Sequence, residues 1–262
     1  MRQFILPADW DGGPRCRLEG GRAHYVSRVL RLAPGDSFPG RDATGRLWSC
    51  GVLEAAPGRL VLSVSPPLEG LEIEGEYRAE TLPRIFLAQA LPKGAKMDLI
   101  IRQATEAGVA AVLPLLSSRA LRVDDGGGAR ASRWERIVRE ARQQSGSGIA
   151  TEVASPLGVR DLPAALANRG VGPDEPRILL HESPLAQSSM HGYLTGAPNS
   201  VALCVGPEGG FARDEVDFLL SEGFKPLRLA GAILRAETAA IYAVAAAQIV
   251  LSERSSWIPK PP

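Results

Sequence analysis

From about residue 83 onwards, the chain alternates apolar runs of strand length with segments of helix length, which limits the folds open to it. Strands are expected at 85–88, 109–116, 177–181, 200–205 and 226–229. Helices are expected at 96–107, 132–144, 214–222 and 237–253. Parallel strands need long crossover connections, and a helix is the usual one. The alternation therefore predicts an α/β domain with a parallel sheet.

The first 66 residues follow a different pattern, with short strands separated by turns. Strands are expected at 2–6 and 60–64, and one helical stretch at 21–31. Gly and Asp at 33–36 and 42–45 are typical of turns. This pattern predicts a small barrel of about five strands. The expected organisation is a barrel over 1–68, a linker rich in Pro, Gly and acidic residues over 69–82, an α/β domain over 83–254 and a loose tail over 255–262.

Composition excludes several classes of protein. With 45% hydrophobic and 23% charged residues among 262, the chain is expected to fold. It has no apolar run of about 18 residues and no secretory h-region, so neither a membrane span nor a signal peptide is expected. Cys16, Cys50 and Cys204 lack metal-ligand spacing, so we expect no metal site and a reduced, cytoplasmic setting.

The net charge of +1 is unevenly distributed. Residues 1–66 contain nine Arg, no Lys and six acidic residues. This local excess is compatible with phosphate contacts, as in nucleic-acid binding. Because Arg outnumbers Lys along the whole chain, charge alone also leaves a purely compositional origin open.

Familiar motifs for phosphoryl or acyl transfer are missing from the sequence. There is no P-loop and no Gly-x-Ser-x-Gly elbow. The glycines at 145–148 follow an expected helix rather than a strand, which is the wrong context for a dinucleotide loop. The three histidines are not clustered. The chain therefore offers no obvious nucleophile or metal site.

Two loops that follow expected strands are the best candidates for a ligand site. The first is Gly206-Pro207-Glu208-Gly209-Gly210, whose glycines leave backbone groups accessible to a ligand. Ligands of open α/β sheets bind at such strand ends, although a tight turn would also explain the loop. The second loop, over 229–238, leads into the last expected helix. There Glu237 also suits a purely structural role, because helix N-termini favour acidic residues.

In these two loops and elsewhere, the sequence resembles the ribosomal RNA small-subunit methyltransferase E family of the SPOUT superfamily. The resemblance rests first on Gly206-Pro207-Glu208-Gly209-Gly210-Phe211, followed by Ile233-Leu234-Arg235 and Glu237-Thr238-Ala239. Further matches are Ala90-Leu91-Pro92-Lys93-Gly94 with Met97, Thr105-Glu106-Ala107-Gly108-Val109, Pro114, Ser118-Arg119 and Gln144-Ser145-Gly146. In the N-terminal part, Arg2, Phe4, His24 and Arg28-Val29-Leu30-Arg31 also match.

The resemblance implies a PUA-like barrel followed by a SPOUT-type α/β domain with a C-terminal trefoil knot. It also implies S-adenosylmethionine as cofactor, a homodimer, and methylation of N3 of a uridine in 16S ribosomal RNA of the small ribosomal subunit. The implied cofactor residues are Leu180, His181, Glu182, Gly206, Pro207, Glu208, Gly209, Gly210, Leu229, Ala230, Gly231, Ile233 and Leu234. The implied RNA contacts are Arg2, His24, Arg28, Arg31, Lys93 and Arg119.

Methyl transfer to N3 requires alignment of the two reactants and loss of the N3 proton. Within the family picture, we expect Arg235 to stabilise the resulting anion and Glu237 to be the less favoured candidate for the base.

The chain departs from the family pattern at several polar positions. Gln103, Gln143 and Ser147 stand where Lys, Glu and Arg are usual, Ala230 and Ala232 replace Gly and Arg, and Ala212 replaces a Ser or Thr cap. Two alternatives therefore remain. One is a SPOUT RNA methyltransferase that modifies another base, and the other is a catalytically weak protein that binds RNA or the ribosome.

The last expected helix, 237–253, is apolar on nearly every face, although a surface helix needs only one apolar stripe. The sheet of its own domain can cover one side. Another helix of the same chain or a partner subunit must cover the other, and the family resemblance favours a partner. Ala243 or Ala247 is expected to face it.

Overall fold

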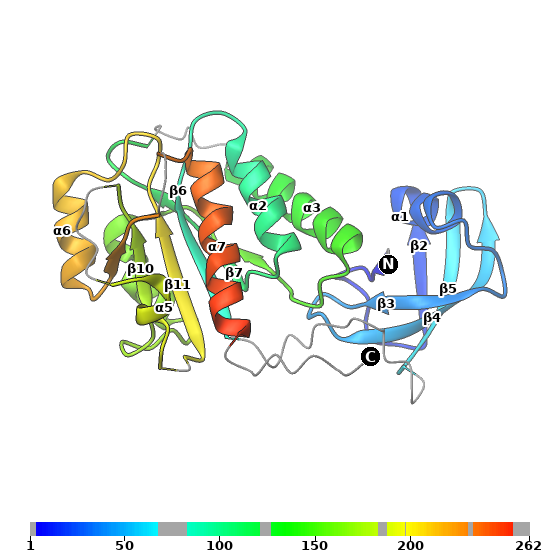
Figure 1. Ribbon diagram of the computed structural model, residues 1–262. Coiled ribbons are helices and arrows are strands. Elements are labelled where there is room, and N and C mark those ends of the chain that lie inside the picture. Colours follow the sequence, from blue (N-terminus) through cyan, green and yellow to red (C-terminus); the bar gives the residue numbers. More distant parts are fainter. Residues whose placement is uncertain are drawn as a thin grey trace. The chain divides into compact units, whose positions relative to one another are not determined.

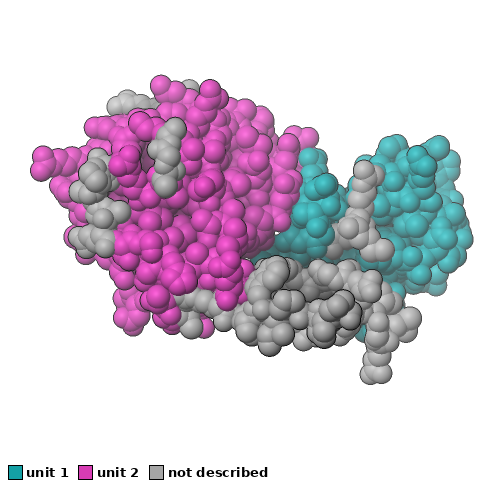
Figure 2. Space-filling view, in the orientation of Figure 1, with its two compact units in different colours: residues 1–79, 139–150 teal, residues 80–138, 151–262 magenta. Residues whose placement is uncertain are grey.

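The computed structural model describes residues 4–67, 83–120, 127–182, 188–196, 198–229 and 233–253. Contacts divide the chain into two units (Figure 2). The first unit comprises residues 1–79 with 139–150, and the second comprises 80–138 with 151–262. The linker expected over 69–82 and the tail expected over 255–262 lie outside the described residues.

The first unit is built on a five-stranded sheet that curls around its own core (Figure 1). The strands are β1 (Phe4–Ile5), β2 (Arg15–Glu19), β3 (Ser37–Arg41), β4 (Leu47–Ala56) and β5 (Arg59–Ser65), in the order β1-β3-β4-β5-β2. Neighbouring strands are antiparallel except β1 and β3. The helix expected over 21–31 is a short α1 (Gly20–His24) followed by a π-helical turn (Tyr25–Val29). The apolar side chains of alternate strand residues fill the interior.

Residues 139–150 also belong to this unit. The sequence did not indicate that this distant segment packs against the N-terminal sheet. The Arg142 guanidinium donates to the carbonyl of Ala43 at 3.3 Å. The backbone at Gly148 passes so close to Gly45 that a Cβ on Gly45 would lie 2.0 Å from the Gly148 carbonyl oxygen. Gly45 also has a φ of 96°, which favours glycine. Close backbone contact therefore holds this distant segment against the turn between β3 and β4.

The second unit contains a fully parallel sheet, as the alternation of strands and helices predicted. Its strands are β6 (Arg84–Ala90), β7 (Ala111–Leu116), β8 (Glu152–Val153), β9 (Leu157–Gly158), β10 (Arg177–Leu180), β11 (Ser200–Val205) and β12 (Lys225–Leu227). The order is β12-β10-β11-β6-β7-β8, and β9 also pairs with β7. The short strands β8 and β9 were not expected, because two-residue strands give no apolar run.

Helices cover both faces of this sheet (Figure 1). One face packs against α2 (Lys96–Glu106), the first half of α3 (Gly127–Ser145), α5 (Met190–Tyr193) and α7 (Ala236–Ser252). The other packs against a 3₁₀ turn (Val159–Asp161), α4 (Leu162–Ala167) and α6 (Arg213–Ser221). Alternate residues of β6 point to opposite faces, so that Ile85 and Leu87 enter one apolar layer and Phe86 and Ala88 the other. No helix within the described ranges is long and apolar enough to cross a bilayer.

Helix α7 buries one stripe and exposes another. Ala240, Ala243, Val244, Ala247 and Leu251 are buried on the side that packs against α2 and the sheet. Tyr242 and Ile249 on the opposite side are each 56% exposed. The expectation that Ala243 or Ala247 faces a partner is therefore wrong, because both are buried within their own domain.

Candidate functional site

The candidate site lies where the sheet changes direction. Strands β6 and β11 are neighbours, but the connection after β6 runs through α2 to β7 on one side, whereas the connection after β11 runs through α6 to β12 on the other. Since α2 and α6 cover opposite faces, the carboxyl ends of these two strands form a topological switch point of the sheet, which we call the crevice. Open α/β sheets bind their ligands at such a point. The sequence indicated the loops but not that β6 lies beside β11.

The glycine loop, residues 206–210, enters this crevice directly after β11. A Cβ on Gly206 would lie 3.3 Å from the ring of the buried Phe211, and Gly210 has a φ of 65°. A Cβ on Gly209 would meet only the Arg119 side chain, at 3.8 Å. Glycine is thus needed at 206 because of the nearby ring and at 210 because of the positive φ. Neither reason applies to Gly209, which has open space on its exposed side.

The Glu208 carboxylate is held by the segment that follows β6. The Lys93 backbone N–H lies 3.3 Å from both Glu208 oxygens, and Lys96 Nζ lies 2.6 Å from Oε1. Partial burial raises the pKa of Glu208, but the hydrogen bonds from Lys96 and from backbone N–H groups outweigh burial and lower it. Glu208 therefore stays ionised in the crevice.

Lys96 also lies 3.4 Å from Glu237 Oε2 in the first turn of α7. The hydrogen bond to Glu208, the largest contribution, raises the pKa of Lys96, so its ammonium stays charged. Lys96 is not among the site residues predicted from the sequence. One signal was available: a cation in the first turn of a helix opposes the helix dipole and so calls for an acidic partner.

A third loop, immediately after β7, supports the glycine loop. The Arg119 guanidinium donates to the Gly209 carbonyl at 2.8 Å. The Ser118 N–H donates to Glu215 at 2.8 Å, and Glu215 also accepts from the Ala212 N–H at 2.9 Å. Glu215 thus satisfies a backbone N–H at the start of α6, where Ala212 has no capping side chain.

The other predicted cofactor residues lie at or after the ends of β10, which pairs with β11, and of β12, which pairs with β10. Leu180 is half-buried, and the His181 N–H donates to the Leu227 carbonyl at 2.9 Å, which joins the two strand ends. Leu229 packs partly against the core. The exposed residues here are Glu182, Ile233 and Arg235, with Leu234 intermediate. The predicted residues Ala230 and Gly231, and the departure Ala232, lie outside the described residues.

The predicted RNA contacts divide between the two units. In the first unit, His24, Arg28 and Arg31 are exposed within one short segment. Glu19, a potential structural partner for these arginines, pairs instead with Arg59 at 3.4 Å. Lys93 and Arg119 belong to the second unit and both support the glycine loop. Arg2 lies outside the described residues.

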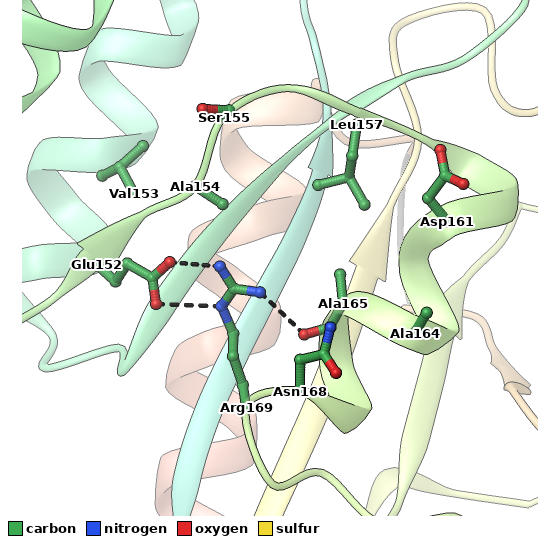
Figure 3. Close-up of a pocket in the computed structure, with 10 residues that line it drawn as sticks. All are labelled: Glu152, Val153, Ala154, Ser155, Leu157, Asp161, Ala164, Ala165, Asn168 and Arg169. Carbon is green, nitrogen blue, oxygen red and sulfur yellow. Dashed lines mark hydrogen bonds and ion pairs between the residues drawn. The ribbon is translucent and has the colours of Figure 1, made fainter.

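A surface cavity of about 610 Å³ is distinct from this crevice (Figure 3). It is lined by β8, β9 and α4, with Glu152 and Arg169 paired across it. Helix α4 covers the sheet face opposite α2 and α7. None of the predicted site residues lines the cavity. Within the described part of the chain, no group of three or more His, Cys, Asp or Glu side chains is arranged to hold a metal ion.

Comparison with known proteins identifies the family. Residues 80–248 match the family model of the RNA methyltransferase domain. Over 230 residues the chain is 36% identical to ribosomal RNA small subunit methyltransferase E of Synechocystis, an alignment that covers 87% of this chain and 71% of the relative. The chain belongs to this family. The Mycobacterium tuberculosis member is 31% identical over 253 residues, which cover 92% of this chain and 89% of that relative.

Solved structures extend the comparison to the fold. A methyltransferase from Legionella pneumophila, solved with its bound cofactor SAM (S-adenosylmethionine), matches with a TM-score of 0.78 and 25% identity, over 95% of this chain and 97% of that one. The family member from Neisseria gonorrhoeae matches with a TM-score of 0.78 and 24% identity, over 95% and 98%. The family resemblance found in the sequence is thus confirmed, together with an α/β methyltransferase fold preceded by a curled sheet.

Proposed function

We propose that this protein transfers a methyl group from S-adenosylmethionine to N3 of a uridine in 16S ribosomal RNA. The observation that carries the proposal is the glycine loop at the crevice between β6 and β11, in a chain that belongs to the small-subunit methyltransferase E family. Relatives 31–36% identical over most of the chain bear that name.

The crevice has groups that fit this cofactor. Gln89, at the end of β6, is fully buried, and its Nε2 lies 2.8 Å from the Ala90 carbonyl and 3.4 Å from that of Gly206. Its Oε1 is buried and has no hydrogen-bond partner in the described structure. Such an acceptor is costly unless a ligand supplies a donor, and S-adenosylmethionine carries N–H and O–H donors. Leu180 ends β10 and Leu229 follows β12, and both are proposed to give the cofactor apolar cover.

Charge in the crevice also suits a cationic methyl donor. Lys96 contributes one positive charge against the two negative charges of Glu208 and Glu237, so this cluster is net negative. When bound, the cofactor supplies an electrophilic methyl group. The protein's own task is then to align the uridine and to stabilise N3 after its proton has left.

Arg235 and Glu237 are the side chains proposed for that task. Arg235 is exposed at the start of α7, where its guanidinium can approach the uridine carbonyl oxygens and stabilise the anion. Glu237 presents Oε2 to Lys96, which leaves Oε1 to accept the N3 proton.

The finer features of the fold belong to the same proposal. We infer a PUA-like barrel for the first unit, a trefoil knot near the C-terminus and a homodimer that presents Tyr242 and Ile249 to its partner. In the order β10-β11-β6, a late strand is inserted between two earlier ones, which is compatible with a knotted connection. A cytoplasmic location follows from the proposed substrate.

Two measurements test the proposed function. Calorimetry should detect binding of S-adenosylmethionine to the purified protein. Small-subunit RNA from a deletion strain should lack one N3-methyluridine, which the wild-type gene restores and Arg235→Ala does not. Cofactor binding with unchanged N3-methyluridine would favour a different target base, and failure to bind the cofactor would favour the RNA-binding alternative.

RNA binding by the first unit has its own test. If Arg28 and Arg31 contact phosphates, the double variant Arg28→Ala, Arg31→Ala should bind RNA more weakly and with a shallower salt dependence. Each lost contact should lower the slope of log K against log salt by about 0.7–0.9 in magnitude. The same slope in both proteins would rule out phosphate contacts by these arginines.

A further inference from the structure

Three segments from distant parts of the sequence meet at one ammonium group. Lys96 opens α2, Glu208 lies in the glycine loop after β11, and Glu237 lies in the first turn of α7. Lys96 Nζ lies 2.6 Å from Glu208 Oε1 and 3.4 Å from Glu237 Oε2. Lys96 thus joins Glu208 of the glycine loop to Glu237 of α7.

The surroundings make this contact specific. The Glu237 side chain is only 14% exposed, and its buried Oε2 has no hydrogen-bond partner in the described structure, so the ion pair with Lys96 is what compensates its burial. Glu208 is fixed further by the Lys93 N–H. Without Lys96, two carboxylates would face each other across the crevice, and their repulsion would push the glycine loop away from α7.

The helices themselves do not depend on Lys96 for their packing. Helices α2 and α7 share an apolar interface, and near their far ends the Gln248 amide donates to the Ala107 carbonyl. Removal of Lys96 leaves the mostly buried Glu237 without its cation, and removal of Arg133 leaves the 19% exposed Asp98 without one, so the two changes should cost similar stability. The effect that belongs to Lys96 alone is therefore expected on the position of the loop.

We propose that Lys96 is a positioning residue for methyl transfer, which holds the glycine loop and the start of α7 in register through Glu208 and Glu237. The inference rests on the proposed function, because the positioned elements are those assigned to the cofactor and to the uridine. Lys96 itself need not touch either reactant.

The test compares three variants of the full-length protein. Lys96→Met keeps the length of the side chain but removes its charge, and Lys96→Arg restores a cation. Arg133→Met is the matched control, because Arg133 pairs with Asp98 of the same helix α2 outside the crevice. For each, kcat and the KM for S-adenosylmethionine are measured with small-subunit RNA, together with the melting temperature.

Lys96→Met should lower kcat/KM about tenfold or more, since small misplacements of reacting groups are costly. Lys96→Arg should recover most of this loss. Arg133→Met should keep wild-type kinetics, and its melting temperature should match that of Lys96→Met. Wild-type kinetics in Lys96→Met, no recovery in Lys96→Arg, or an equal kinetic loss in Arg133→Met would each overturn the proposal. Absence of activity in the wild-type protein would instead count against the proposed function.

Discussion

At the scale of single residues, the glycine loop contains glycines of different kinds. Gly206 and Gly210 meet steric demands within the loop, whereas Gly209 has open space beside Arg119. The sequence predicts this loop as a candidate site, because Gly-Pro-Glu-Gly-Gly after a buried strand is an unusual combination. It could not distinguish the roles of the glycines, since these depend on the Phe211 ring and on the side chain of Arg119.

Gly209→Val should abolish cofactor binding while the protein stays folded, because the valine would occupy the space left for the ligand. Calorimetry with S-adenosylmethionine and a thermal melt check the two parts of this expectation. Gly172→Val is the matched control, because Gly172 lies outside the candidate site and a Cβ added there would meet nothing within 4 Å. Normal affinity in Gly209→Val would show that the cofactor does not approach this glycine.

The three cysteines provide a second residue-scale prediction. All are buried and free, and burial raises the pKa of Cys16 to about 11, that of Cys50 to about 12, and that of Cys204 further. Because the thiolate is the reactive form, a thiol reagent at pH 8 should label none in the native protein and all three after denaturation. Rapid labelling of the native protein would contradict the burial of these side chains.

At the scale of elements, α7 shows what the spacing of apolar residues can and cannot predict about a helix. Its apolar composition predicted a helix covered on two sides, and the structure confirms cover on one, by α2 and the sheet. Which residues form each side could not be predicted, because nearly all positions are apolar and the sequence has no polar stripe to orient the helix. The exposed pair Tyr242 and Ile249 now identifies the other side.

If a partner subunit covers that side, Tyr242→Arg with Ile249→Arg should convert a dimer into a folded monomer, because two cations cannot be buried without partners. Light scattering at micromolar concentration measures the mass. Leu53 of β4 is an exposed apolar residue of the first unit, so Leu53→Arg is the control and should not change the mass. A wild-type monomer under these conditions would exclude the proposed dimer.

At the scale of the whole molecule, the first unit is discontinuous in sequence. Short strands separated by turns predicted a small barrel, and the structure shows a curled five-stranded sheet. The alternation of strands and helices predicted the parallel sheet. Neither pattern predicted the return of residues 139–150 to the first unit. Nothing local marks that return, because Arg142 and Gly148 become significant only beside Ala43 and Gly45. The order of the parallel strands was unpredictable for the same reason.

Gly45→Ala should destabilise the protein by disturbing the contact between residues 139–150 and the turn between β3 and β4. Its Cβ would overlap the Gly148 carbonyl, so overpacking of about 1–3 kcal/mol adds to a cost of about 1 kcal/mol for a left-handed backbone. Gly58→Ala should show only the cost of the left-handed backbone. Gly58 also has a positive φ, but a Cβ added there would meet nothing within 4 Å. Thermal unfolding compares them, and equal losses would mean that the close approach at Gly45 contributes nothing.

The same discontinuity affects the order in which the protein can fold as it is made. The N-terminal sheet leaves the ribosome early, yet the segment that packs against its Asp42 turn follows only after β6, α2 and β7 have been synthesised. Domains usually fold one after another during translation. Here the first unit cannot be completed until residue 150 has been synthesised. By then β6, α2 and β7 of the second unit are also available, so the folding of the two units overlaps in time.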